Sequence, residues 1–496
     1  MSGLPSGWCE ASISELVDLN PKQAFEDDLI AGFVPMSHAP TNFRDKLVFD
    51  ERPWGEIKKA YTNFKNGDVI FAKVTPCFEN GKAALVEGLP NGIGAGSSEF
   101  FVLRPACKDV SAKYLLAIVK SHGFMSEGAE NMTGAVGLRR VPRQFLEGYR
   151  VPVPPAAEQT RIAAKLDELL AQVDTLKARI DGIPALLKRF RQSVLAAAVS
   201  GRLTEEWRIK EPQEPDDASA LLSLTKEKKL NWAALNSHHN EASRVIKRAN
   251  AFDVSSLDDT GLPAGWIWSD LEDVVLLVVD CHNKTAPYQE SGVPLVRTTN
   301  IRSGAFSWHG LRYVSDETYQ FWSRRCPPEP EDIVFTREAP MGEAAIVPQG
   351  MTLCLGQRTM LFRCFDDLTS ARYLHLALLD PVFKDRSEKV AVGTGVKHFR
   401  VGDVSNLKIP VPPKKEQIEI VRRVEQLFAF AAQLEARVTT AQTRIDRLTQ
   451  SILAKAFRGE LVSQDPNDEP ASVLLERIKA QRAAAPKVKR GRKASA

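Results

Sequence analysis

The sequence has no long apolar run and no pair of closely spaced cysteines. Its densest aliphatic run covers only residues 274–279, whereas a bilayer-spanning helix needs about 20 apolar residues. The start, residues 1–5, has neither the basic nor the apolar stretch of a secretory signal. The seven cysteines are scattered without a Cys-x-x-Cys pair, which favours reduced, buried thiols. We therefore expect a cytoplasmic protein with no transmembrane helix and no disulfide framework.

Sequence motifs of catalysis are also missing. No Gly-x-x-x-x-Gly-Lys-Ser/Thr phosphate loop occurs, and no His/Cys cluster has the spacing of a zinc site. A base-modifying methyltransferase would need a Gly-rich cofactor loop and an Asn/Asp-Pro-Pro-aromatic motif. The Pro-Pro pairs here follow Val153, Cys326 and Val411 instead. The eight histidines show no triad pattern. We expect a chain that is not an enzyme and binds no metal or cofactor itself.

Charge and composition set only broad limits. The net charge of +4 is mildly basic, which permits a nucleic-acid partner without requiring one. Apolar residues make up 43% and charged residues 26% of the chain, as in ordinary globular proteins. With 496 residues, there is room for two or three domains.

A constant frame of short motifs is written twice, 258 residues apart. Residues 3–8 (GLPSGW) return as 261–266 (GLPAGW), and residues 151–155 (VPVPP) return as 409–413 (IPVPP). Further repeated pieces are Glu158-Gln159 with Glu416-Gln417, residues 193–196 with 451–454, and Gly201-x-Leu203 with Gly459-x-Leu461. Between these anchors the copies diverge. Each repeat therefore holds a constant frame around a variable globular part of about 150 residues.

After each Pro-Pro pair, apolar residues recur at alternating steps of four and three. This strict heptad pattern predicts a coiled coil with a left-handed supercoil. The predicted seam is Ile162, Leu166, Leu169, Val173, Leu176, Ile180, Leu187, Phe190 and Val194 in the first copy, and Ile420, Val424, Leu427, Leu434, Val438, Ile445, Leu448 and Ile452 in the second. Gly182 and Pro184 interrupt the first stripe without shifting its phase, so we expect a kink rather than a break. Two separate bundle helices, each packed on its own domain, are the alternative.

The variable parts are typical of α+β domains. Short β-rich runs lie between Gly and Pro turns at 68–74, 99–103, 332–336 and 360–363, and helices are expected at 112–120 and 370–379. The polar stretch 204–258 predicts a helix near 218–235 and carries the basic residues Arg244, Lys247 and Arg248. One helix per repeat predicts a pseudo-two-fold axis, about which paired helices run antiparallel. The predicted fold is two similar α+β domains separated by an antiparallel coiled coil of two long helices.

The order of these motifs, repeated twice, resembles the specificity subunits of type I restriction–modification enzymes. The likeness covers residues 1 to about 462. It rests on Leu-Pro-x-Gly-Trp at 4–8 and 262–266, on Pro-x-Pro-Pro-x-x-Glu-Gln at 152–159 and 410–417, on the Ser-Val/Ile-Leu-Ala helix ends, and on GTGVKH at 393–398 leading into 407–410. The first copy matches this last motif less well, at 134–140.

The resemblance implies a domain plan and a set of partners. The plan is a target-recognition domain at 1–157, a conserved helix at 158–203, a partly helical connector at 204–258, a second target-recognition domain at 259–413, a second conserved helix at 414–462, and a C-terminal helix with a basic tail at 463–496. Each domain would read one half of a bipartite, gapped site in double-stranded DNA. The helices would set the spacer and dock two adenine methyltransferase subunits, which use S-adenosylmethionine. Two restriction subunits, which use ATP and Mg²⁺, would join them.

Candidate DNA contacts are residues that can donate hydrogen bonds to bases or phosphates. Base reading needs arginine forks and amides, and phosphate anchoring needs Lys, Arg and hydroxyl groups. The candidates are Arg44, Lys46, Lys58, Lys59, Lys73, Thr75, Arg139, Arg140 and Arg143 in the first domain, and Arg297, Thr298, Asn300, Arg302, Arg337, Gln357, Arg358, Lys397, His398 and Arg400 in the second. For any one of them, solvated surface charge is the simpler interpretation.

Three further choices stay open in the sequence. Trp8 and Trp266 are interpreted as packing anchors that close each domain onto its helix, with base stacking as the alternative. Four cations near the helix entries bind a methyltransferase or are solvated: Arg161, Lys165, Arg422 and Arg423. The competing functions are a duplicated coiled-coil scaffold without DNA contact and a fused enzyme. Two divergent domains on constant helices argue against the scaffold, and the missing motifs argue against the enzyme.

Overall fold

The computed structural model describes residues 3–135, 137–211, 217–365, 367–393 and 397–484. The chain forms two compact units. The first combines residues 1–182 with 438–496, and the second is residues 183–437. Each unit therefore contains one globular part and a stretch of both long helices. No helix among the described residues is long and apolar enough to cross a membrane.

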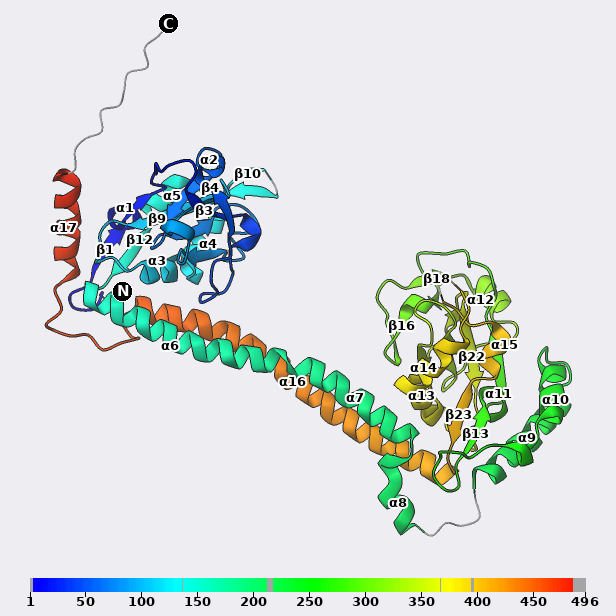
Figure 1. The fold of residues 1–496 in the computed structure, drawn as a ribbon. Helices are drawn as coiled ribbons and strands as arrows, with labels where there is room; N and C mark the ends of the chain where they lie inside the picture. Colours follow the sequence, from blue (N-terminus) through cyan, green and yellow to red (C-terminus); the bar gives the residue numbers. More distant parts are fainter. Residues whose placement is uncertain (1–2, 136, 212–216, 366, 394–396, 485–496) are drawn as a thin grey trace, which may run out of the picture. The chain divides into compact units, whose positions relative to one another are not determined.

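The first unit is built on two four-stranded sheets (Figure 1). One is antiparallel with the order β2 (Val17–Leu19), β9 (Phe100–Pro105), β6 (Val69–Ala72) and β7 (Ala83–Leu85). The other has the order β4 (Asp50–Pro53), β3 (Ile30–Val34), β8 (Ile93–Gly96) and β5 (Thr62–Lys65), with β3 and β8 parallel. All four residues of β6 are buried, as the continuous apolar run Val69–Ala72 requires.

The second unit repeats this topology. Its four-stranded sheet has the order β14 (Leu277–Asp280), β22 (Thr359–Arg363), β19 (Ile333–Thr336) and β20 (Ala344–Ile346). A smaller sheet joins β18 (Arg312–Val314), β15 (Val293–Val296) and β21 (Cys354–Leu355), with β15 and β21 parallel, as β3 and β8 are. A short hairpin, β16 (Ile301–Arg302) and β17 (Ala305–Phe306), stands beside them. All four β-rich runs predicted from sequence form strands.

The predicted domain helices form at equivalent positions. α3 (Ala112–Val119) and α13 (Ala371–Leu379) each begin at a serine, Ser111 or Ser370, whose side chain accepts from a backbone N–H in the first turn. They are followed by α4 (His122–Glu130) and α14 (Pro381–Val390), and later by α5 (Arg143–Gly148) and α15 (Val401–Ser405). The apolar side chains of α3 and α13 join the main core of their unit.

A two-stranded ribbon made from the constant frame leads into each long helix. β1 (Cys9–Ser12) pairs with β12 (Arg150–Val153), and β13 (Ile267–Asp270) pairs with β23 (Lys408–Val411), both antiparallel and in the same register. Short helices follow the first strand of each ribbon, α1 (Ile13–Leu16) and α11 (Leu271–Val274).

The long helices are α6 (Ala156–Asp181), α7 (Ile183–Val199) and α16 (Lys414–Phe457). The expected single kinked helix is therefore two helices. Helical hydrogen bonding ends at Asp181 and resumes at Ile183, while Gly182 keeps helical backbone angles (φ −76°, ψ −21°). The cause is Pro184, which lacks the N–H that would continue the hydrogen-bond ladder.

The long helices pair antiparallel within each unit, as predicted (Figure 1). In the first unit, Lys177 lies 3.4 Å from Asp446, and Asp181, four residues further along α6, bonds Gln442, four residues earlier on α16, at 2.9 Å. Ile162 and Ile452 join one apolar cluster there. In the second unit, Arg191 Nη2 donates to Glu435 Oε2 at 3.0 Å, and Val194, Ile420 and Val424 share a cluster.

Two predicted seam residues are only partly covered. Leu176 is 46% exposed and Leu448 is 43% exposed. Near the entry of α6 the seam is covered by the partner helix and also by α3, and Leu170 there is more buried than the predicted Leu169. Towards the end of α6 the pairing leaves leucines in contact with solvent. The heptad pattern identifies the facing side of a helix but not how many neighbours cover it.

The segment after each long helix packs in the same way. α9 (Ala218–Leu235) begins where Ala218 N donates to Gly265 O at 3.1 Å, and α17 (Ala471–Ala484) begins where Ala471 N donates to Gly7 O at 2.8 Å. α8 (Glu205–Lys210) precedes α9. Thus the segment after the first repeat's helix packs on the second repeat's frame, and the reverse holds for α17.

The end of each long helix is also equivalent. Gly201 and Gly459 have left-handed φ values of +73° and +72°. A Cβ atom at either would meet the Cγ atom of a proline at 2.5 Å, Pro263 or Pro5. These repeated glycines are therefore required by both backbone conformation and close packing.

The helix predicted at 218–235 forms with those bounds, but a second helix, α10 (Ala242–Ala251), was not predicted. Its two arginines, Arg244 and Arg248, bind within the unit. Arg248 donates to Asp273 at 2.6 and 2.7 Å and to Asp270 at 2.8 Å. The predicted connector therefore contributes packing to the second unit.

Candidate nucleic-acid interface

Trp8 and Trp266 are anchors of the frame. The indole Nε1 of Trp8 donates to Glu158 Oε2 at 2.9 Å, and that of Trp266 donates to Glu416 Oε2 at 2.8 Å. Both rings are buried, which confirms the interpretation as packing anchors. Burial raises the pKa of Glu158 above its ordinary value, and the hydrogen bond from Trp8 opposes this shift.

The repeated glutamine makes equivalent hydrogen bonds in both copies. Gln159 accepts from Ser111 N at 3.0 Å and donates to Pro154 O at 3.0 Å. Gln417 accepts from Ser370 N at 2.9 Å and donates to Pro412 O at 2.9 Å. The constant motif Glu-Gln therefore fixes the domain helix and the helix entry together, and it is structural.

The cations at the helix entries are also engaged within their units. Arg161 pairs with Asp468 at 2.6 Å, which ties α6 to the segment leading to α17. Arg422 and Arg423 share Glu419 at 2.7 and 2.6 Å. These pairs, together with the Lys165–Glu168 pair at 2.8 Å, agree with surface and packing roles.

Four first-unit candidates meet where β6 ends. Thr75 Oγ1 accepts from Arg139 N at 2.8 Å and donates to Arg139 O at 3.1 Å. Arg139 and Arg140 belong to β11 (Leu138–Arg140), which pairs with β10 (Thr133–Ala135). Lys73 Nζ donates to Ser98 O at 2.8 Å. The structure thus joins Lys73, Thr75, Arg139 and Arg140 at one end of the sheet.

An acidic residue also lies in this group. Glu99 accepts two hydrogen bonds from Arg140, at 2.9 and 2.7 Å. These bonds lower the pKa of Glu99. The candidates drawn from the sequence do not include Glu99, because they were chosen as hydrogen-bond donors.

The other first-unit candidates lie elsewhere. Arg44 pairs with Asp174 of α6 at 3.2 Å, Lys58 pairs with Asp27, and Arg143 pairs with Glu147 one turn along α5 at 2.7 Å. Lys46 and Lys59 are exposed. These five residues do not join the cluster at the end of β6.

The second unit has the same arrangement at the end of β19. Lys73 O accepts from Val141 N at 2.8 Å, and Arg337 O accepts from Phe399 N at 3.0 Å. Lys73 N donates to Glu99 O at 2.9 Å, and Arg337 N donates to Arg358 O at the same distance. Lys73 and Arg337 are therefore equivalent, and so are Glu99 and Arg358. The two units share these backbone hydrogen bonds but carry different side chains at the equivalent positions.

Four second-unit candidates line one cavity of about 290 Å³. They are Arg297, Thr298, Gln357 and Arg358, and the lining also includes Thr285, Tyr288, Leu295 and Glu338, among others. Thr298 Oγ1 donates to Ala339 O at 3.1 Å, and Gln357 Nε2 donates to Thr285 Oγ1 at 2.9 Å. Arg358 forms an ion pair with Glu338. The acidic Glu338 was missed for the same reason as Glu99.

The remaining second-unit candidates have different surroundings. Asn300 is buried, and its amide nitrogen donates to Ser307 O at 3.2 Å and His309 O at 3.4 Å. It holds the loop, so in this structure it faces no solvent. The other four lie around the same end of the unit. Arg302 donates to Thr298 O at 2.8 Å, and Lys397 lies 3.7 Å from Glu388. Arg400 precedes α15, and His398 forms a backbone bridge with Glu338.

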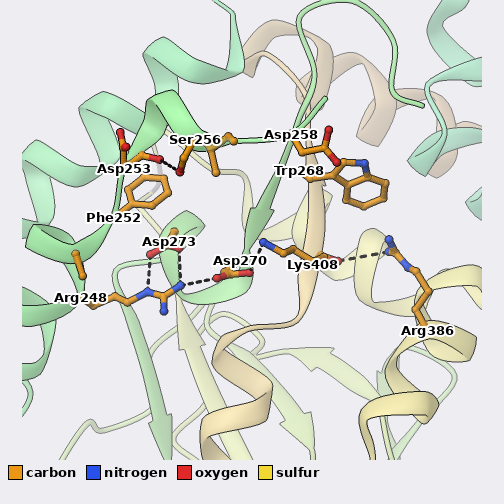
Figure 2. Close-up of a pocket in the computed structure, with 12 residues that line it drawn as sticks. Arg248, Phe252, Asp253, Ser256, Asp258, Trp268, Asp270, Asp273, Arg386 and Lys408 are labelled. Carbon is orange, nitrogen blue, oxygen red and sulfur yellow. Dashed lines mark hydrogen bonds and ion pairs between the residues drawn. The ribbon is translucent and has the colours of Figure 1, made fainter. Parts of the chain in front are cut away.

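A larger cavity of about 500 Å³ lies beside α10 and the β13–β23 ribbon. Figure 2 shows Arg248 directed at Asp273 and Asp270, and Lys408 beside Asp270. Arg386 lies over the ring of Trp268 at 4.6 Å, and burial lowers its pKa. Because Arg248 and Lys408 already pair with carboxylates, this cavity is a poor phosphate site. The Arg248 pairs instead fix α10 to the β13–α11 segment. In the described part of the chain, no group of three or more His, Cys, Asp or Glu residues could hold a metal ion.

Comparison with known proteins decides the family. The family model described as "Type I restriction modification DNA specificity domain" matches residues 5–185 and 278–441. This chain belongs to that family. The specificity subunit of the type I restriction enzyme EcoKI from Escherichia coli K12 is 34% identical over 413 residues, covering 79% of this chain and 76% of the relative. The StySPI specificity subunit of Salmonella potsdam is 30% identical over 535 residues, covering 99% and 98%.

Solved structures show the same fold. The HsdS subunit from Thermoanaerobacter tengcongensis superposes with a TM-score of 0.55 at 20% identity, covering 92% of this chain and 98% of that one. A chain from a study of the assembly and conformational transition of the type I R-M system gives a TM-score of 0.59 at 19% identity, covering 93% and 100%. These structures confirm the α+β fold with paired long helices. The family model and the relatives confirm the resemblance carried by the repeated frame, that of a specificity subunit.

Proposed function

We propose that each unit of this type I specificity subunit reads one half of a bipartite, gapped site in double-stranded DNA. The observation that carries the proposal is the equivalence of the two sheet ends. Lys73, Thr75 and Arg140 at one correspond to Arg337, Ala339 and His398 at the other, on the same backbone ladder. A constant scaffold that presents different side chains is the arrangement that two unlike half-sites require.

The partners are part of the same proposal. Two adenine methyltransferase subunits, each with S-adenosylmethionine, dock on the long helices. Two restriction subunits, which use ATP and Mg²⁺, complete the complex in the cytoplasm. Supporting this, α6 and α16 of the first unit expose Leu176 and Leu448, and α7 and α16 of the second expose Leu186 and Phe430 at 54% and 55%. A docking subunit would remove these apolar side chains from water.

The test is methylome sequencing of cells that contain the partner methyltransferase, with and without the gene for this chain. We expect one bipartite motif of methylated adenine to disappear with the gene. Restoring the gene on a plasmid should restore the same motif, and deleting a restriction subunit instead should leave it. An unchanged methylome in the presence of an active methyltransferase would contradict the proposal and favour the scaffold alternative.

A further inference from the structure

A carboxylate in a cavity proposed to face DNA needs an explanation, because phosphates repel it. The Glu338 side chain is 25% exposed, lines the second unit's cavity and pairs with Arg358. The first unit has a similar pair at the equivalent sheet end, where Glu99 binds Arg140. The two pairs are arranged differently along the chain: the residue before the central strand is the acid Glu99 in one unit and the base Arg358 in the other.

The Glu338–Arg358 pair is open to solvent on its arginine side. The Arg358 side chain is 44% exposed, and ion pairs of this exposure contribute little to folding free energy. Arg358 nevertheless has a left-handed φ of +70°, which a non-glycine residue adopts only when its surroundings enforce it. Glu99, the equivalent residue of the first unit, makes the same backbone hydrogen bond without a left-handed φ, so this geometry is particular to Arg358. Unfavourable backbone geometry around a weak ion pair is typical of functional positions.

The other donors of the cavity are engaged elsewhere. The Gln357 amide nitrogen is bound by Thr285, and Arg297 Nη2 donates to Gly310 O at 3.1 Å. The Arg358 side chain pairs with Glu338, and a guanidinium has five N–H donors. The Arg358 side chain is 44% exposed beside its contact with Glu338, so the other N–H groups of its guanidinium are available to a ligand.

This combination matches one base pair. In the major groove, guanine presents two acceptors, N7 and O6, to which an arginine fork donates, and its partner cytosine presents an N4 amino donor, which a carboxylate accepts. We infer that Arg358 and Glu338 together read a G·C pair in the half-site of the second unit. The inference rests on the proposed function and adds to it the base pair and the two residues that specify it.

The experiment uses the whole complex. Arg358→Lys keeps the charge but removes the fork, and Glu338→Gln keeps the size but removes the carboxylate. The control is Arg372→Lys, because Arg372 of α13 makes exposed ion pairs with Glu425 at 2.9 Å and Glu331 at 3.5 Å and does not line the cavity. Methylome motifs are compared for the three variants and the unaltered chain. Binding of the purified complex to duplexes with each single base pair replaced gives a second readout.

We expect both cavity variants to relax one G·C position of one half-site, with about a 10- to 100-fold loss of discrimination there. The other half-site and the control should not change. The inference is overturned if Arg358→Lys retains full discrimination, if it weakens all duplexes equally, or if the second half-site contains no G·C pair. These outcomes leave the proposed function standing, whereas absence of any bipartite motif with the unaltered chain would remove both.

Discussion

The indole of Trp8 donates its only hydrogen bond to the buried carboxylate of Glu158, 150 residues away in the chain. Trp266 and Glu416 repeat this bond in the second unit. Each bond joins the first residues of a repeat to the entry of its long helix. The constant frame of the sequence is thus a device that fixes a variable domain on a constant helix.

Replacing Trp8 by Phe should destabilise the first unit by about 1–3 kcal/mol, because a buried carboxyl group loses its hydrogen-bond donor. Urea unfolding of the full chain, followed by circular dichroism, measures the change. Trp308→Phe is the matched control, since Trp308 is 43% exposed and stacks on Phe306. Equal stability of Trp8→Phe and Trp308→Phe would show that the bond does not matter.

Lys120 should make stability depend on pH. Its Nζ is buried and donates to Thr41 O at 2.8 Å and Gly81 O at 2.9 Å, and burial lowers its pKa to about 7. Between about pH 7 and 10 the unfolded chain therefore binds the proton more tightly than the folded chain. Stability conferred at this site should rise with pH through that window, by at most about 1.4 kcal/mol per unit.

The comparison is with Lys120→Met, which cannot titrate. The difference in unfolding free energy between the unaltered chain and the variant should shift in favour of the unaltered chain as pH rises from 7 to 10. Other titrating groups, common to both proteins, cancel in this difference. A constant difference across the window would mean that the carbonyl oxygens hold the charged amine without a penalty.

The apolar stripe contains residues of two kinds, which mutation should separate. Leu166 is fully buried, and Leu166→Ala should cost about 2–5 kcal/mol. Leu176→Ala on the same helix should cost under about 1 kcal/mol, because its side chain is 46% exposed. If methyltransferase subunits dock there, the Leu176 variant should weaken their binding in a titration with purified subunit. A variant that loses stability but keeps binding would place Leu176 in the fold instead.

The repeated motifs carry most of what the sequence can predict here. Glu-Gln pairs, Pro-Pro entries and terminal glycines occupy equivalent structural positions, since each meets a constant partner such as Ser111 or Pro263. The helix expected near 218–235 forms with these bounds, and Asp217 caps it by accepting a hydrogen bond from Ala220 N. These motifs act through residues close to them in the chain or through the repeated frame, so their structures can be predicted from sequence.

What the sequence did not reveal depends on contacts between distant segments. Leu176 and Leu448 fit the heptad pattern as well as Leu166 does, and only the number of covering neighbours separates them. Asn300 has an amide that could read a base, but its nitrogen donates hydrogen bonds to backbone carbonyls of the 307–309 loop. Glu338 lines the cavity but was not among the candidates, because these were chosen as hydrogen-bond donors. Residue type thus predicts what a side chain can bind, and packing decides whether it is available.

The length of the paired helices is the last property that can be tested by itself. The sequence predicts that the helices set the spacer between half-sites, and the paired residues Lys177 and Asp446 mark matched positions for an insertion. Four added residues in each helix lengthen it by about 6 Å, the rise of about two base pairs of DNA. We expect the methylated motif to keep both half-sites and to gain a longer gap. The control is an insertion of four residues in α6 alone, which breaks the register of the pair and should abolish methylation. A motif with altered half-sites and an unchanged gap would show that the helices do not measure distance, because only the reading units would then respond.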